Sequence, residues 1–209
     1  EAIVLAAYYD SWSIVPALSP GATDALGISV LLEAARVLSQ NPPQRSIILL
    51  ALSGHWQTLW GAREYIDRHF NSLGYKIKLF ASLNLAADTD QLAVYNTGET
   101  YAFFNLGSLN SRYAWLIDML FRKYLPAMQE IYGKDFGADF IDRIFYSYPS
   151  GIHQAPPTDF VGTFSFDSEP YILACYGGGF AYHTTNAIRL YQKTPADTFE
   201  KLNLKNLWP

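Results

Sequence analysis

The chain has 209 residues, half of them apolar, and carries a formal net charge of −4. This length suits one compact domain, and the low content and acidic balance of charged residues give no electrostatic reason to bind nucleic acid or an anionic membrane. The single cysteine, Cys175, excludes an internal disulfide, and every apolar run is far shorter than the roughly 20 residues that span a bilayer. We therefore expect no membrane-spanning segment.

The first half of the chain alternates short apolar runs with segments of helical periodicity. The apolar runs predict buried strands, and the periodic segments predict helices. A stretch rich in serine, proline and glycine, residues 10–23, predicts a long loop. This order favours an α/β fold with a mixed, mostly parallel central sheet and helices on both faces. The predicted strands are 2–9, 46–52, 75–85 and 91–95, and the predicted helices are 26–38 and 60–70.

The second half is less regular. An amphipathic pattern predicts a long helix over 109–132, kinked at Pro126. Residues 135–162 contain three prolines and resemble an irregular insertion at the edge of a cleft. The remaining predictions are a helix over 169–174, a strand over 177–185 and a C-terminal helix over 196–207.

Five separated segments carry the most specific pattern: Leu5–Ser11, Pro20–Gly27, Leu52–Gln57, Leu83–Ala86 and Lys193–Thr198. In order and spacing they resemble the sequence blocks of the zinc aminopeptidases, co-catalytic di-zinc exopeptidases related to glutamate carboxypeptidases, glutaminyl cyclases and the transferrin receptor ectodomain. The resemblance covers nearly the whole chain and implies a zinc exopeptidase-like sheet. Relatives carry further secondary structure before the first block. We therefore expect residues 1–209 to form a single peptidase-like domain that lacks its N-terminal part.

The resemblance also implies which positions would serve the chemistry. In working relatives a His, a bridging Asp, a Glu, an Asp and a second His bind two zinc ions, and another Glu is the general base. Such donors are needed to hold two cations and a reactive water. The residues at the five ligand positions of this chain are Tyr8, Asp24, Trp56, Ala86 and Lys193, and His55 stands at the position of the general base.

Most of these replacements cannot bind a metal. Indole, methyl and protonated amine groups offer no lone pair to zinc, so we expect the chain to bind no zinc and no other cofactor. Asp10, which stands where relatives have an Asp that orients the first His, and His55 are then vestiges of the catalytic apparatus. The sequence predicts a pseudoenzyme.

A buried Asp24 without a cation is costly unless it is paired. We expect Lys193 to approach from the opposite side of the pocket and to place its ammonium group about where a zinc ion would lie. This charge would neutralise Asp24. Tyr8 and Trp56 would fill the remaining volume of the vacated metal site.

Two acidic residues, Asp167 and Glu169, lie where relatives place a polar loop near the substrate pocket. The same Asp-Ser-Glu-Pro sequence is also an ordinary helix N-terminus, and both interpretations stay open. His69, His153 and His183 have no partners at metal-ligand spacing, and we expect structural roles for them.

We expect a non-catalytic binding or scaffolding module of a larger protein, with a peptide or a protein as its partner. By resemblance alone, the location is extracytoplasmic or in the ectodomain of a membrane protein. The alternative is a metal-dependent aminopeptidase or another hydrolase with a rewired site built on Asp10, Asp24, His55 and Asp167.

Overall fold

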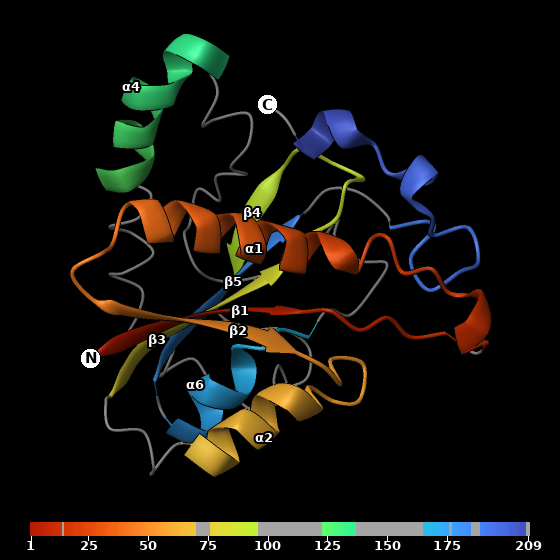
Figure 1. The fold of residues 1–209 in the computed structure, drawn as a ribbon, viewed down its shortest axis with the longest axis horizontal. Helices are drawn as coiled ribbons and strands as arrows, with labels where there is room; N and C mark the ends of the chain where they lie inside the picture. Colours follow the sequence, from red (N-terminus) through yellow and green to blue (C-terminus); the bar gives the residue numbers. More distant parts are fainter. Residues whose placement is uncertain are drawn as a thin grey trace.

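A five-stranded sheet with the order β2-β1-β3-β5-β4 forms the centre of the molecule (Figure 1). Four strands run parallel, and β4 pairs antiparallel with β5. The strands are β1 (Ala2–Tyr8), β2 (Ser46–Leu52), β3 (Ile77–Asn84), β4 (Leu92–Tyr95) and β5 (Gly178–Thr184). The computed structural model describes residues 1–13, 15–69, 76–95, 123–136, 165–175, 177–184 and 189–207.

Helices cover both faces of the sheet. In Figure 1, α1 (Ala25–Gln40) lies on one face, and α2 (Trp60–His69) and α6 (Glu169–Cys175) lie together on the other. The predicted α/β fold, with its mixed and mostly parallel sheet, is confirmed. Shorter helical turns are η1 (Pro16–Leu18), η4 (Phe199–Lys201) and η5 (Leu204–Leu207).

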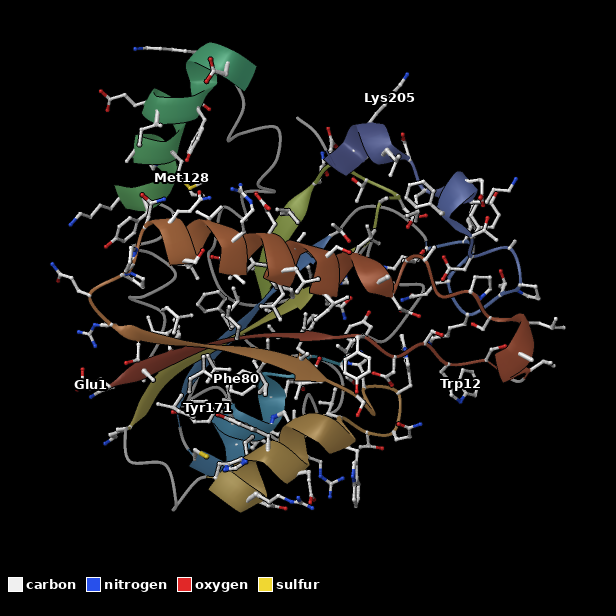
Figure 2. The ribbon with its side chains drawn as sticks, in the orientation of Figure 1. Glu1, Trp12, Phe80, Met128, Tyr171 and Lys205 are labelled. Carbon is white, nitrogen blue, oxygen red and sulfur yellow. The ribbon has the colours of Figure 1, made fainter. Side chains whose placement is uncertain are left out.

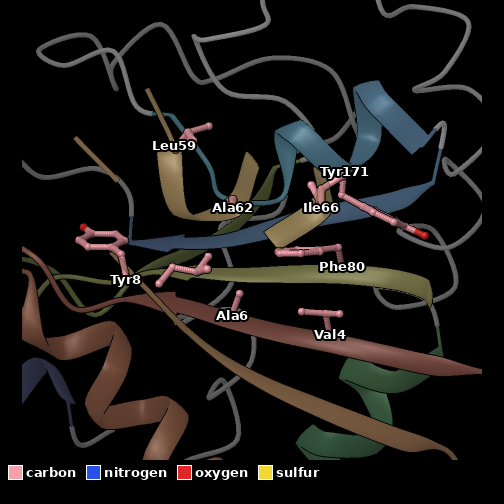
Figure 3. Packing of buried hydrophobic residues seen from close by; sticks show 9 residues of the cluster. Val4, Ala6, Tyr8, Leu59, Ala62, Ile66, Phe80 and Tyr171 are labelled. Atoms are coloured by element: carbon pink, nitrogen blue, oxygen red, sulfur yellow. The ribbon is translucent and has the colours of Figure 1, made fainter. Parts of the chain in front are cut away.

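The alternation of side chains along β1 builds two cores. Val4, Ala6 and Tyr8 point toward α2 and α6, where they pack in a cluster that includes Phe80 and Tyr171 (Figure 3). The intervening Ala7 points to the opposite face and packs against Leu31 of α1 and Leu83 of β3. Because β1 is buried on both faces, its sequence is a continuous apolar run.

Three sequence predictions need correction or completion. Residues 46–52 do form a strand, but only Leu52 is buried, because β2 lies at one edge of the sheet, with β4 at the other. The C-terminal helix is wrong: two short 3-10 turns are separated at Leu202, whose extended backbone cannot continue a helix. The described part of the long predicted helix is α4 (Leu125–Phe136), which includes Pro126 and extends four residues beyond the predicted end.

The rest of that predicted helix, residues 109–122, lies outside the described residues, as does the predicted insertion from residue 137 onward. Within the described ranges, no helix combines the length and the apolar character that a bilayer crossing requires.

Candidate functional site

The candidate site lies at the carboxyl ends of the parallel strands. Tyr8 ends β1, Asn84 ends β3 and Thr184 ends β5, so these residues meet at one edge of the sheet. Asp24 immediately precedes α1, and His55 follows the end of β2. In open α/β sheets this edge is where ligands generally bind.

Tyr8 is the central side chain of the site. Its hydroxyl group lies 3.4 Å from Asp24 Oδ1 and 3.5 Å from Asn84 Oδ1, and its ring stacks on the imidazole of His55 with 3.9 Å between centroids. Burial raises the pKa of Tyr8 well above its ordinary value. The phenol is therefore a neutral hydrogen-bond donor at neutral pH.

Arg189, which the sequence analysis did not single out, crosses the strand ends. Its guanidinium group donates to Asn84 Oδ1 at 2.5 Å, to the Asn84 carbonyl oxygen at 2.9 Å and to Thr184 Oγ1 at 3.1 Å. Burial and the nearby Arg189 charge hold the pKa of His183 well below its usual range, so its neutral Nδ1 accepts from Arg189 at 3.1 Å. The guanidinium also attracts the Asp24 carboxylate electrostatically. A fixed cation thus lies inside the site.

Asp24 is buried, with 2 % of its surface exposed. Its Oδ1 accepts from Gln192 Nε2 at 2.7 Å, whereas its Oδ2 is buried without a hydrogen-bond partner. Burial raises the pKa of Asp24 to about 6, partly offset by the hydrogen bond from Gln192. The carboxylate is held in place but incompletely satisfied.

The predicted ion pair between Lys193 and Asp24 is wrong as a direct contact. The two side chains form no salt bridge, and the Lys193 ammonium lies instead over the indole of Trp56, 3.7 Å from the ring centroid. The hydrogen bond to Asp24 comes from the preceding residue, Gln192. Burial lowers the pKa of Lys193, and the attraction of Asp24 opposes that shift, so the two charges still interact at longer range.

His55 forms a buried pair with Asp167. Its Nδ1 lies 2.9 Å from Asp167 Oδ2, and only 3 % of the His55 surface is exposed. Asp10 contacts the backbone of this segment rather than the imidazole: its carboxylate accepts from the Gly54 N–H at 3.0 Å and the His55 N–H at 3.4 Å. His55 is therefore a core residue of the site and not a rim residue.

The other residues that the sequence analysis named as site positions differ in whether they belong to the site. Asp167 belongs to the site through His55, but Glu169 accepts from the Phe166 N–H at 2.5 Å and so caps the start of α6. Ala86 is buried and contributes its backbone N–H to Thr184 Oγ1. Of the histidines, His183 is the one that joins the site through Arg189; His153 lies outside the described residues.

Among the described residues, the assembled site includes the buried carboxylates of Asp24 and Asp167, and the buried Asp197 carboxylate acts on Asp24. Aromatic rings and the cations Arg189 and Lys193 lie around them. In the part of the chain that the structure describes, no three His, Cys, Asp or Glu side chains are grouped so that they could hold a metal ion. Arg189 was missed because a lone arginine in a loop has no periodicity or spacing that marks it. The one feature of the sequence that could have pointed to Arg189 is its position, four residues before the Lys193–Thr198 segment.

Comparison with known proteins identifies the family of the chain and solved structures with a similar fold. The sequence model of peptidase family M28 matches residues 1–208, whereas no curated protein matches the sequence. The fold is similar to BSAP, a zinc aminopeptidase from Bacillus subtilis, with 20 % identity and a TM-score of 0.59 over 99 % of this chain and 42 % of that chain. It is also similar to glutaminyl cyclase of Porphyromonas gingivalis, with 18 % identity, a TM-score of 0.57 and coverage of 99 % and 68 %.

A third similar structure is nicastrin, a component of γ-secretase, with 12 % identity, a TM-score of 0.53 and coverage of 99 % of this chain and 38 % of that chain. The chain therefore spans less than half the length of both BSAP and nicastrin. The match of the family model over nearly every residue, on a sheet of this topology, shows that the chain belongs to peptidase family M28.

Proposed function

We propose that this chain is a non-catalytic zinc-aminopeptidase-like domain, a pseudopeptidase, that acts as a binding or scaffolding module of a larger protein. The observation that carries the proposal is the Arg189 guanidinium, which bonds Asn84 and attracts Asp24, residues beside and at the positions aligned with metal ligands. A fixed positive charge there repels a dication. It also supplies a countercharge for Asp24, which a metal ion would otherwise supply.

The donor set does not fit a pair of zinc ions. Zinc sites use three or four nitrogen, oxygen or sulfur donors. Trp56 and Ala86 have no side-chain lone pair for a metal, Lys193 places its ammonium on an indole, and the buried phenol of Tyr8 stays protonated. Asp24 alone keeps a suitable ligand group among the five aligned positions.

The position of the general base supports the same proposal. His55 is enclosed between the ring of Tyr8 and the carboxylate of Asp167. A general base must come within hydrogen-bond reach of a substrate proton, and the imidazole is stacked on Tyr8 with only 3 % of its surface exposed. We therefore derive no hydrolytic step from this site.

A module of this kind would bind a peptide or another protein. The similarity to a γ-secretase component supports a place in a larger assembly, and the family resemblance supports an extracytoplasmic or ectodomain location. The Trp12 and Trp56 indoles beside the strand ends offer contact surface for a partner.

The test is an aminopeptidase assay on a panel of aminoacyl p-nitroanilides, with and without added Zn²⁺, beside calorimetric titration of the protein with short peptides. We expect no turnover above the buffer rate under either condition and saturable binding of at least one peptide. Metal-dependent turnover would overturn the proposal in favour of a rewired hydrolase. Absence of turnover and of all peptide binding would leave scaffolding as the role.

A further inference from the structure

Two indoles beside the site share one cation. The Lys193 ammonium lies 3.7 Å from the ring centroid of Trp56 and 5.9 Å from that of Trp12, both within the range of cation–π attraction. Trp12 projects from the loop after β1, far along the chain from Lys193 (Figure 2). We call this pair of rings the Trp12–Trp56 slot. The fold, rather than local sequence, brings it together.

Tyr8 connects the slot to a buried carboxylate, that of Asp24. The ring of Tyr8 meets Trp56 edge-on at 6.0 Å between centroids, and the Tyr8 hydroxyl group contacts Asp24. Asp24 attracts the Lys193 ammonium, and one of its oxygens, Oδ2, is buried without a partner. Aromatic faces in front of a carboxylate form a binding surface for an organic cation.

The backbone of Lys193 is strained. Its φ of 66° lies in the left-handed region, which favours glycine over lysine. Lys193 therefore adopts this backbone against its local preference. Glycine suits the same backbone, so the side chain can be removed without a change of the chain path.

The local charges favour a monocation as the replacement. The charged side chains near Asp24 include the carboxylates of Asp167 and Asp197 and the cations of Arg189 and Lys193, and His55 is paired with Asp167. Withdrawal of the lysine removes one positive charge that Asp24 attracts. A ligand with a single positive charge replaces what is removed.

We propose that the Trp12–Trp56 slot is a binding site for a primary alkylammonium group of the lysine type, and that Lys193 occupies it as an internal substitute for that ligand. This inference rests on the proposed function, because a metal pair at Asp24 would remove the negative charge that the ligand needs. It adds a ligand class to that function and an autoinhibitory contact that controls access.

The experiment replaces Lys193 by glycine, which suits the left-handed backbone, and supplies the missing side chain as n-butylammonium chloride. Binding is measured by calorimetry at constant ionic strength, with EDTA present so that the result does not depend on zinc. The neutral probe is n-butanol. The matched control variant is Lys201→Ala, which removes an exposed lysine over another ring, Tyr191, at 5.8 Å.

We expect saturable binding of n-butylammonium to Lys193→Gly at least tenfold tighter than to the wild type or to Lys201→Ala, and loss of binding when Trp56→Leu is added. Circular dichroism of each variant checks that it is folded. No saturable binding to Lys193→Gly, or equal binding of n-butanol, would overturn the inference. Turnover with zinc in the separate enzyme assay would instead contradict the proposed function.

Discussion

At the scale of single residues, the described site contains a covalently attached cation, Arg189, that attracts Asp24. Arg189 connects the ends of β3 and β5 by donating hydrogen bonds to Asn84 and Thr184. The guanidinium is suited to this because its fork of donors can satisfy several fixed acceptors at once.

Replacing Arg189 by methionine would remove the hydrogen bonds that it donates to Asn84, Thr184 and His183 and would remove a cationic neighbour of Asp24. We expect a loss of about 3 kcal/mol in the free energy of unfolding, measured by urea denaturation. Arg45→Met is the control, because Arg45 forms an exposed ion pair with Glu1 and its loss should cost about 1 kcal/mol or less. Equal losses in the two variants would contradict a bridging role for Arg189.

The Asp24 carboxylate predicts a pH dependence. Its folded pKa, about 6, lies above the ordinary value of 3.8, so the folded state binds the proton more tightly than the unfolded state. Stability from this group is therefore present at low pH and is lost as the pH rises from about 4 to about 6. We expect Asp24→Asn to be more stable than the wild type at pH 7 and to lose that advantage by pH 4, measured by urea unfolding at each pH. A difference that does not vary with pH would contradict the shifted pKa.

At the scale of elements, the turn between β2 and α2 depends on close backbone packing. A Cβ atom on Gly61 would lie 2.2 Å from the carbonyl oxygen of Ser53, which also accepts the Gly61 N–H. The start of α2 can approach the end of β2 only without a side chain at this position. The position of His55, within the same turn, depends on that approach.

Gly61→Ala should therefore destabilise the fold by about 2 kcal/mol, since the backbone must move to relieve the clash. Gly133→Ala in α4 is the matched control, and we expect it to stabilise the fold rather than destabilise it. The atoms nearest to its new methyl group belong to the flexible side chain of Gln129, and alanine favours a helix over glycine by about 0.5–1 kcal/mol. Thermal unfolding of both variants gives the comparison, and a stabilising Gly61→Ala would contradict the described packing.

The elements were predictable where a single periodicity governs them. The apolar run of β1 and the helical spacing of α1 appear in the sequence because each element is buried along its length or along one face. The C-terminal segment was not predictable, because its apolar residues have helical spacing while Leu202 adopts an extended backbone. The edge position of β2 depends on which strands pair, and an apolar run does not specify that.

At the scale of the whole molecule, the aligned positions came together because the sequence blocks end parallel strands. Tyr8, Asp24 and His55 could thus be placed at one edge of the sheet from the sequence. The side chains that contact the residues of the site could not be predicted from the sequence. The position of Lys193 on Trp56, and of Arg189 on Asn84, is set by tertiary contacts between distant segments that carry no local signal.

The loss of the metal pair is the central claim, and zinc stoichiometry tests it most directly. The protein is saturated with ZnCl₂, dialysed against metal-free buffer and analysed by inductively coupled plasma mass spectrometry. The account predicts far less than one zinc ion per chain, because Asp24 is the single suitable ligand at the aligned positions and Arg189 lies beside it. Two zinc ions per chain, retained in the wild type and lost in Asp24→Asn, would contradict it.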